Sequence, residues 1–256
     1  EKHGSLTAFE SYLRAMALIR VTGPEALEAA ADRLEQALQS NDRHAAAHGA
    51  LAWLATLMIP QGRAPRHADA LRHADAALRF GQDDCDALAM GGYALGFLTR
   101  QPETGLPPLE RALSLNPNSR QAHENMGWLL LCCGHYDRAV VHFATAVRLA
   151  PMDDFAFRTL AGHAFADLFL GRHEQAEAKA RRALVAAPAY TIAHRALAAA
   201  LVGLGRTASA REVVADLTAR HPGLTLDRYA VEMRFADPEA RTILLASLRE
   251  AGLRQR

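Results

Sequence analysis

Lysine is almost missing from the sequence, occurring only at Lys2 and Lys179. The positive charge is therefore nearly all arginine, and it is interspersed with Asp and Glu to give a net charge of +1. Proteins that bind nucleic acids usually gather basic side chains on one face, and no such stripe runs along this chain. We therefore expect no nucleic-acid partner.

Cysteine is also scarce, with Cys85, Cys132 and Cys133 the three in the chain. An odd number with two adjacent members does not make a disulfide framework. The spacing of Cys and His also lacks the paired pattern typical of zinc sites. We expect reduced, partly buried thiols, which favours a cytoplasmic location, and no metal or other cofactor.

Long apolar runs are absent, and no segment has the length needed to cross a bilayer. The chain starts without Met and without the apolar stretch of a signal peptide. These features predict no membrane insertion and a fragment or processed product of a larger protein. The predicted location is cytoplasmic, with the periplasm as the alternative if the larger protein is tethered to a membrane.

The strand-forming residues Val, Ile and Thr are sparse, whereas Ala, Leu and Arg dominate. Ala, Leu and Arg favour helices, and the β-branched residues favour strands. Half of the residues are apolar and 22% are charged, as in folded globular proteins and unlike disordered ones. The composition predicts an all-α fold.

An internal repeat is the main positive signal, and its fullest copy is residues 120–151. This copy has the tetratricopeptide (TPR) pattern, in which small residues let two antiparallel helices approach, larger side chains fill the space beside them, and a proline ends the pair. The matching positions are Met126, Gly127, Gly134, Tyr136, Ala139, Phe143, Ala146 and Pro151.

Prolines end successive copies of this pattern at positions 117, 151, 188 and 222. Two earlier copies end without proline, and the second has an insertion at 60–65. The pattern predicts a right-handed α-solenoid of about six TPR helix pairs in residues 1–222. Their expected ranges are 6–42, 43–82, 83–117, 118–151, 152–188 and 189–222. Helices in 223–256 are expected to cap the end of the stack and continue it, because a terminal repeat has no neighbour to bury its apolar face.

The first helix of each pair lines the concave face of such a solenoid. The residues on this face predict an aromatic-lined groove with ionic side chains, suited to an extended peptide or a partner helix. In the alternative interpretation these side chains fill the inside of the solenoid, or a C-terminal element folds back over them. The candidate residues are Tyr12, Met16, Trp53, Asp86, Tyr93, Phe97, Gln121, Glu124, Trp128, Arg158, Phe165, Phe169 and Arg195.

Candidate chemistry outside this face is weak. His44 and His48 have the spacing of a helical metal pair, but no third ligand is evident. Cys132 and Cys133 have His135 nearby but no sign of an oriented base or oxyanion site. The pair at 91–92 is too short for a phosphate loop and is better explained by close helix packing. We expect a protein without catalytic residues or a metal site.

Four phrases in the chain, at residues 8–15, 51–53, 115–119 and 234–239, carry a narrower resemblance. Together they resemble the C-terminal TPR region of bacterial class III adenylate/guanylate cyclases and of some winged-helix transcriptional regulators. The resemblance implies an interaction module from a larger signalling protein. The leading hypothesis is therefore a scaffold that binds a peptide or partner protein in its groove. The alternative is a small-effector sensor that controls an attached cyclase or DNA-binding domain, and self-association is a further hypothesis.

Overall fold

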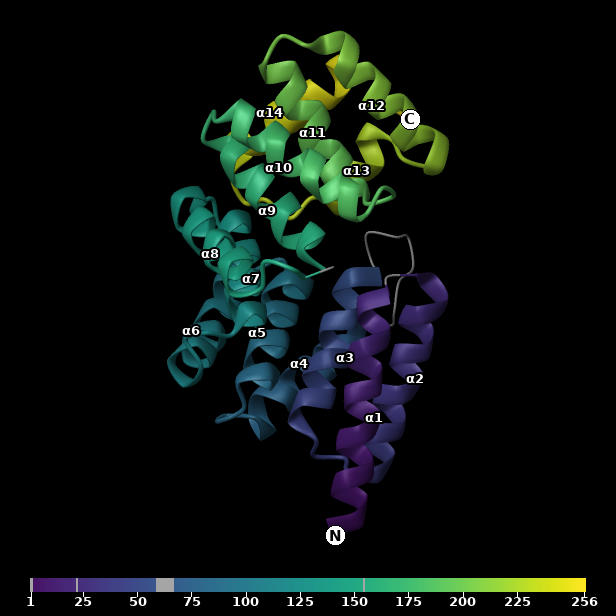
Figure 1. Cartoon of the computed structure of the whole chain (residues 1–256), viewed down its shortest axis with the longest axis vertical. Coiled ribbons are helices and arrows are strands. Elements are labelled where there is room, and N and C mark those ends of the chain that lie inside the picture. The colour runs from purple at the N-terminus through teal and green to yellow at the C-terminus, as the bar shows by residue number, and fades with distance from the viewer. Residues whose placement is uncertain (1, 22, 59–66, 154) are drawn as a thin grey trace. The chain divides into compact units, whose positions relative to one another are not determined.

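The computed structural model describes residues 2–21, 23–58, 67–153 and 155–256 (Figure 1). Within these ranges the chain forms fourteen α-helices, one short 3-10 helix and no β-strand. The predicted all-α class, with six helix pairs followed by C-terminal helices, is confirmed. The expected insertion at 60–65 lies outside the described residues.

The chain divides into two compact units, residues 1–129 and 130–256, and the boundary falls inside helix α7. The helices of the first unit are α1 (Lys2–Val21), α2 (Pro24–Ser40), α3 (Ala45–Met58), α4 (His67–Phe80), α5 (Cys85–Thr99), the 3-10 helix (Pro102–Gly105), α6 (Leu106–Leu115) and the start of α7 (Arg120–Cys132). Those of the second are α8 (Tyr136–Leu149), α9 (Ala156–Phe169), α10 (His173–Ala186), α11 (Thr191–Gly203), α12 (Thr207–Arg220), α13 (Leu226–Glu232) and α14 (Pro238–Glu250).

Within each unit, helices pack mainly on their neighbours in sequence. In the first unit α1 packs on α2, α3 on α4 and α5, and α5 on α6. In the second, α9 packs on α8, α10 and α11, and α11 packs on α12 and α14. The first helix of a pair therefore packs against helices on several sides, whereas the second helix of a pair packs on fewer sides. Accordingly, every residue of α9 from Phe157 to Leu168 is buried, whereas α10 buries only Ala176, Ala180 and Ala183.

Two adjacent glycines hold α5 between α4 and α6. A Cβ atom on Gly91 would lie 3.0 Å from the Cβ of Ala77 on α4. A Cβ atom on Gly92 would lie 2.8 Å from the Cβ of Pro108 on α6. Both distances are shorter than ordinary packing contacts. The glycines thus allow the close helix contact expected from the sequence.

The turns between pairs repeat one hydrogen bond, in which an amide N–H donates to the carbonyl three residues earlier. The donor and acceptor residues are His44 and Asn41, Asp84 and Gly81, Ser119 and Asn116, Asp153 and Ala150, Tyr190 and Ala187, and Leu224 and His221, at 3.0–3.2 Å. The turns inside three pairs contain Gly134, Gly171 and Gly205 with φ between 71° and 84°. Arg100, with φ 59°, has this left-handed conformation at the end of α5.

Replacing Arg100 with glycine is expected to stabilise residues 1–129 by about 1 kcal/mol relative to Arg100→Ala, because a side chain in the left-handed region costs roughly that much. The two variants lack the same side-chain contacts and differ only at Cβ. Urea unfolding followed by tryptophan fluorescence measures the difference, since both tryptophans lie in this unit. Equal unfolding midpoints for the two variants would contradict the expectation.

Candidate functional site

Most of the predicted groove residues are buried. Only Asp86 is exposed, and Met16, Phe97, Gln121 and Phe169 are partly buried. The remaining candidates, each at most 8% exposed, are Tyr12, Trp53, Tyr93, Glu124, Trp128, Arg158, Phe165 and Arg195. These side chains therefore do not form an open row of aromatic rings.

In the first unit, Tyr12 packs against the ring of His44, with the ring centroids 5.4 Å apart. Burial, together with the nearby carboxylates of Asp86 and Asp84, raises the pKa of the Tyr12 hydroxyl. Tyr93 stacks on Phe97 within α5, with the ring centroids 5.7 Å apart. These contacts identify Tyr12 and Tyr93 as packing residues.

An open cleft of about 630 Å³ lies beside two of the turns of the first unit. The guanidinium groups of Arg43 and Arg79 lie 5.2 and 4.5 Å from the centroid of the Phe80 ring, an arrangement typical of cation–π contacts. Asp83 and Asp84 line the same cleft. The cleft therefore offers charges of both signs around one aromatic ring.

The histidines of this unit form a different pair from the one suggested by spacing. The Nδ1 of His44 accepts a hydrogen bond from the amide of Ala47 at 3.3 Å. His48 instead contacts His73, with their Nδ1 atoms 2.8 Å apart. Burial and the neighbouring His48 lower the pKa of His73 to about 4. Among the residues described by the structure, no three His, Cys, Asp or Glu side chains are grouped as a metal site would require.

In the second unit, residues 233–237 between α13 and α14 contact α9, the end of α7 and the start of α8; we call them the C-terminal segment. Its Phe235 ring lies 5.6 Å from the ring of Phe165 and 5.1 Å from that of Phe169, both on α9. Phe235 is only 8% exposed. Two predicted groove residues therefore contact the chain's own C-terminal segment.

Polar contacts fix the same segment. The amide of Ala236 donates to the carbonyl of Cys132 at 2.8 Å, which satisfies one of the carbonyls left free at the end of α7. The hydroxyl of Tyr136 donates to a carboxylate oxygen of Asp237 at 2.7 Å, and this bond holds the pKa of Asp237 below its ordinary value. Asp237 also accepts from the amide of Glu239 at the start of α14.

Arg195, a third predicted groove residue of the second unit, also meets the C-terminal region. Its guanidinium lies 4.2 Å from the centroid of the Tyr229 ring on α13. It also donates to the hydroxyl of Thr191 on α11 at 3.0 Å. Phe165, Phe169 and Arg195 thus all contact residues 229–237, as in the second interpretation drawn from the sequence.

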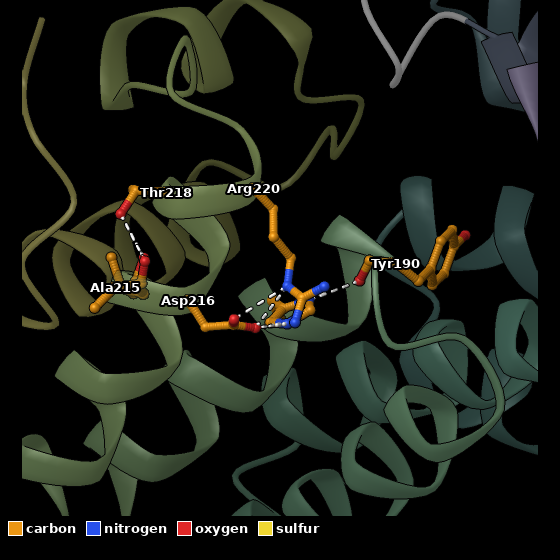
Figure 2. Close-up of polar contacts among 7 residues, drawn as sticks. Tyr190, Ala215, Asp216, Thr218 and Arg220 are labelled. Carbon is orange, nitrogen blue, oxygen red and sulfur yellow. Dashed lines mark hydrogen bonds and ion pairs between the residues drawn. The ribbon is translucent and has the colours of Figure 1, made fainter.

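A separate polar network joins α11 to α12. The ring nitrogens of His194 form hydrogen bonds with the carbonyl of Tyr190 at 3.1 Å and with Asp216 at 3.2 Å. Figure 2 shows Arg220 reaching Asp216, with Nε 3.0 Å from both carboxylate oxygens. Hydrogen bonds from Arg220 lower the pKa of Asp216. This network positions helices, and the sequence analysis did not identify it.

Among the described residues of the second unit, the most buried ionic group is Asp167 on α9. Its carboxylate lies 2.6 Å from the Nζ of Lys179, 3.7 Å from Arg172 and 3.8 Å from the Nε2 of His163. Burial and the charge of Lys179 lower the pKa of His163 to about 4. The carboxylate therefore connects α9 with α10.

Several solved structures are similar to this chain, and TPR proteins are among them. The type IV pilus biogenesis factor PilW is 19% identical, with a TM-score of 0.56 over 79% of this chain and 92% of its own. TTC0263, a TPR protein of Thermus thermophilus, is 20% identical, with a TM-score of 0.55 over 76% and 99%. A chain of the APC/C hetero-tetramer Cut9–Hcn1 is 15% identical, with a TM-score of 0.63 over 87% and 39%.

These similarities, at 20% identity or less, establish that the chain has the TPR fold. No protein-family model matches the chain, and no curated protein matches it. Among the described residues, no helix combines the length and the apolar character that a bilayer crossing requires.

Proposed function

We propose that this chain is a non-catalytic interaction scaffold that binds an extended segment of a partner protein on the first helices of its TPR pairs. The observation that carries the proposal is the C-terminal segment. Five residues outside any helix lie on α9 and beside the end of α7, through aromatic, backbone and carboxylate contacts. These are the kinds of contact by which proteins recognise extended peptides.

The chemistry of these contacts defines the peptide that this surface would take. Phe235 supplies an aromatic ring to Phe165 and Phe169, the amide of Ala236 supplies a donor, and Asp237 supplies a carboxylate to Tyr136. A partner segment would therefore be extended, with an aromatic residue followed two positions later by an acidic one. Such a segment would compete with the chain's own residues for the same surface.

In the first unit we propose contacts through the predicted groove residues with accessible surface. Met16, Phe97 and Gln121 are partly buried, and Asp86 is exposed. The buried Tyr93 ring stacks on Phe97 and supports it. One structural neighbour, the chain of the Cut9–Hcn1 hetero-tetramer, forms a complex with another protein, which is consistent with an interaction scaffold.

A peptide in trans tests the proposal. A fluorescent peptide with the sequence of residues 231–237 is titrated against the whole chain and against Phe235→Ala, which vacates the aromatic position. We expect at least tenfold tighter binding to the variant, because the internal competitor is weakened. A peptide with alanine in place of Phe235 should bind at least tenfold more weakly than the parent peptide.

A second variant tests the same proposal if Phe235→Ala unfolds the C-terminal region. Asp237→Asn keeps a side chain that can cap α14 but loses the charge that faces Tyr136. This variant should also bind the peptide more tightly than the unmodified chain, by about threefold. If both variants are folded by circular dichroism and neither gains affinity, the proposed surface is wrong.

The alternative function, a small-effector sensor controlling an attached cyclase or DNA-binding domain, rests on the resemblance described above. Binding of a small molecule raises the apparent stability of the folded state. Thermal unfolding of this chain against a panel of metabolites therefore separates the two. A metabolite that raises the melting temperature while the peptide does not would favour the sensor over the scaffold.

A further inference from the structure

The exposed face of α1 has five apolar side chains, with the charged Glu10 and Arg20 exposed among them. Leu6, Phe9, Leu13 and Val21 are 66%, 50%, 50% and 69% exposed, and Ala17 between them is exposed as well. Steps of three and four residues place these side chains along one face of a helix. We call this set the α1 stripe.

The α1 stripe is distinct from the side of the helix that packs inside the unit. The buried side chains of α1 are Ala8, Tyr12, Ala15 and Ile19, and α1 packs on α2 and α3. The stripe therefore remains after the helix has buried its core face. Several exposed apolar side chains on one helix face indicate an interaction site, whereas single exposed apolar residues are ordinary.

The charged side chains on the exposed face of α1 indicate which partner would fit the stripe. Glu10 and Arg14 lie one turn apart on α1, joined by an exposed salt bridge of 2.6 Å. If a second α1 packs antiparallel, with the two-fold axis near residue 12, Glu10 of each copy faces Arg14 of the other. A parallel copy would instead place Glu10 beside Glu10. The charge order is thus self-complementary for the antiparallel arrangement.

We infer that the α1 stripe is an interface with a second copy of this chain, formed by antiparallel packing of α1 against α1 about a two-fold axis. Such an interface uses the same patch on both copies. The apolar stripe supplies the contact area, and Glu10 and Arg14 set the direction of the two helices. The inference is independent of the proposed peptide-binding surface.

Sedimentation equilibrium of the whole chain at micromolar concentrations tests the inference. The unmodified chain should be a dimer, and Leu13→Glu should be a monomer with its dissociation constant raised at least a hundredfold. Val185→Glu is the matched control, because Val185 is 84% exposed on α10 and outside the α1 stripe. This control should remain dimeric, and all three proteins should have the same helix content.

Charge reversal tests the identity of the partner. Glu10→Arg and Arg14→Glu should each be monomeric, because each places four like charges across the interface. An equimolar mixture of the two variants should form heterodimers, because one copy is then basic and the other acidic. A monomeric unmodified chain at about 100 μM, a dimeric Leu13→Glu variant, or a mixture that stays monomeric would each overturn the inference.

Discussion

Replacing Asp167 with alanine is expected to destabilise residues 130–256 by about 3 kcal/mol, since removing one member of a buried ion pair strands the other. The Asp167 side chain is 3% exposed, whereas Lys179 is 21% exposed and keeps some access to water. Both tryptophans lie in the other unit, so hydrogen exchange of α9 and α10 is the measurement. Protection of these amides should fall about a hundredfold.

Asp137→Ala is the matched control for Asp167→Ala. Asp137 is 77% exposed and also contacts Arg172, at 3.1 Å. Exposed pairs of this kind contribute about 0.5 kcal/mol or less, so hydrogen exchange should change by no more than two- or threefold. If the two aspartate variants had equal effects, burial of the Asp167 carboxylate would not be the source of its contribution.

Acidification is expected to destabilise each unit by about 2 kcal/mol between pH 6.5 and pH 4. His73 in the first unit and His163 in the second have pKa values lowered from 6.5 to about 4. The unfolded chain therefore binds more protons than the folded chain within this window. Their neutral forms stabilise fully above pH 6.5, and that contribution is lost as the pH falls to 4.

The surroundings of each histidine explain why its protonation destabilises the fold. Burial disfavours the charged form of both rings, a charge on His73 also lies beside the His48 ring, and a charge on His163 faces the charge of Lys179. Urea unfolding at a series of pH values, followed by tryptophan fluorescence, measures the first unit. Hydrogen exchange measures the second.

Single glutamine variants check the assignment of this acid effect. His73→Gln should flatten the pH dependence of the first unit and leave that of the second unchanged. His163→Gln should do the reverse. If the acid-induced loss of stability persisted unchanged in His73→Gln, another group of this unit, such as His44, whose pKa burial also lowers, would be its source.

The helix-pair fold could be predicted from sequence because its determinants are local. Small residues such as Ala139 and Ala146, together with the recurring prolines, report helix contacts within about 35 residues of chain. The role of Gly91 and Gly92 followed from the same reasoning. At Gly203, the last residue of α11, a Cβ atom would lie 2.6 Å from the His173 ring, and the repeat pattern did not reveal this close contact.

The candidate site was less predictable, because its contacts join residues far apart in the chain. Helical spacing places Phe165 and Phe169 on an inner face, but it does not reveal that Phe235 covers them. His48 and His73 are 25 residues apart on different helices, so spacing suggested His44 as the partner of His48 instead. No local pattern encodes such pairs.

The bond between Tyr136 and Asp237 spans 101 residues, whereas most helices of this unit pack on near neighbours in sequence. Closing so long a loop has a high entropic cost and slows folding. A nascent chain emerging from the ribosome would complete α8 and α9 well before Asp237 is synthesised. For that interval the surface around Phe165 would be uncovered, which gives a chaperone or a partner its earliest access to the protein.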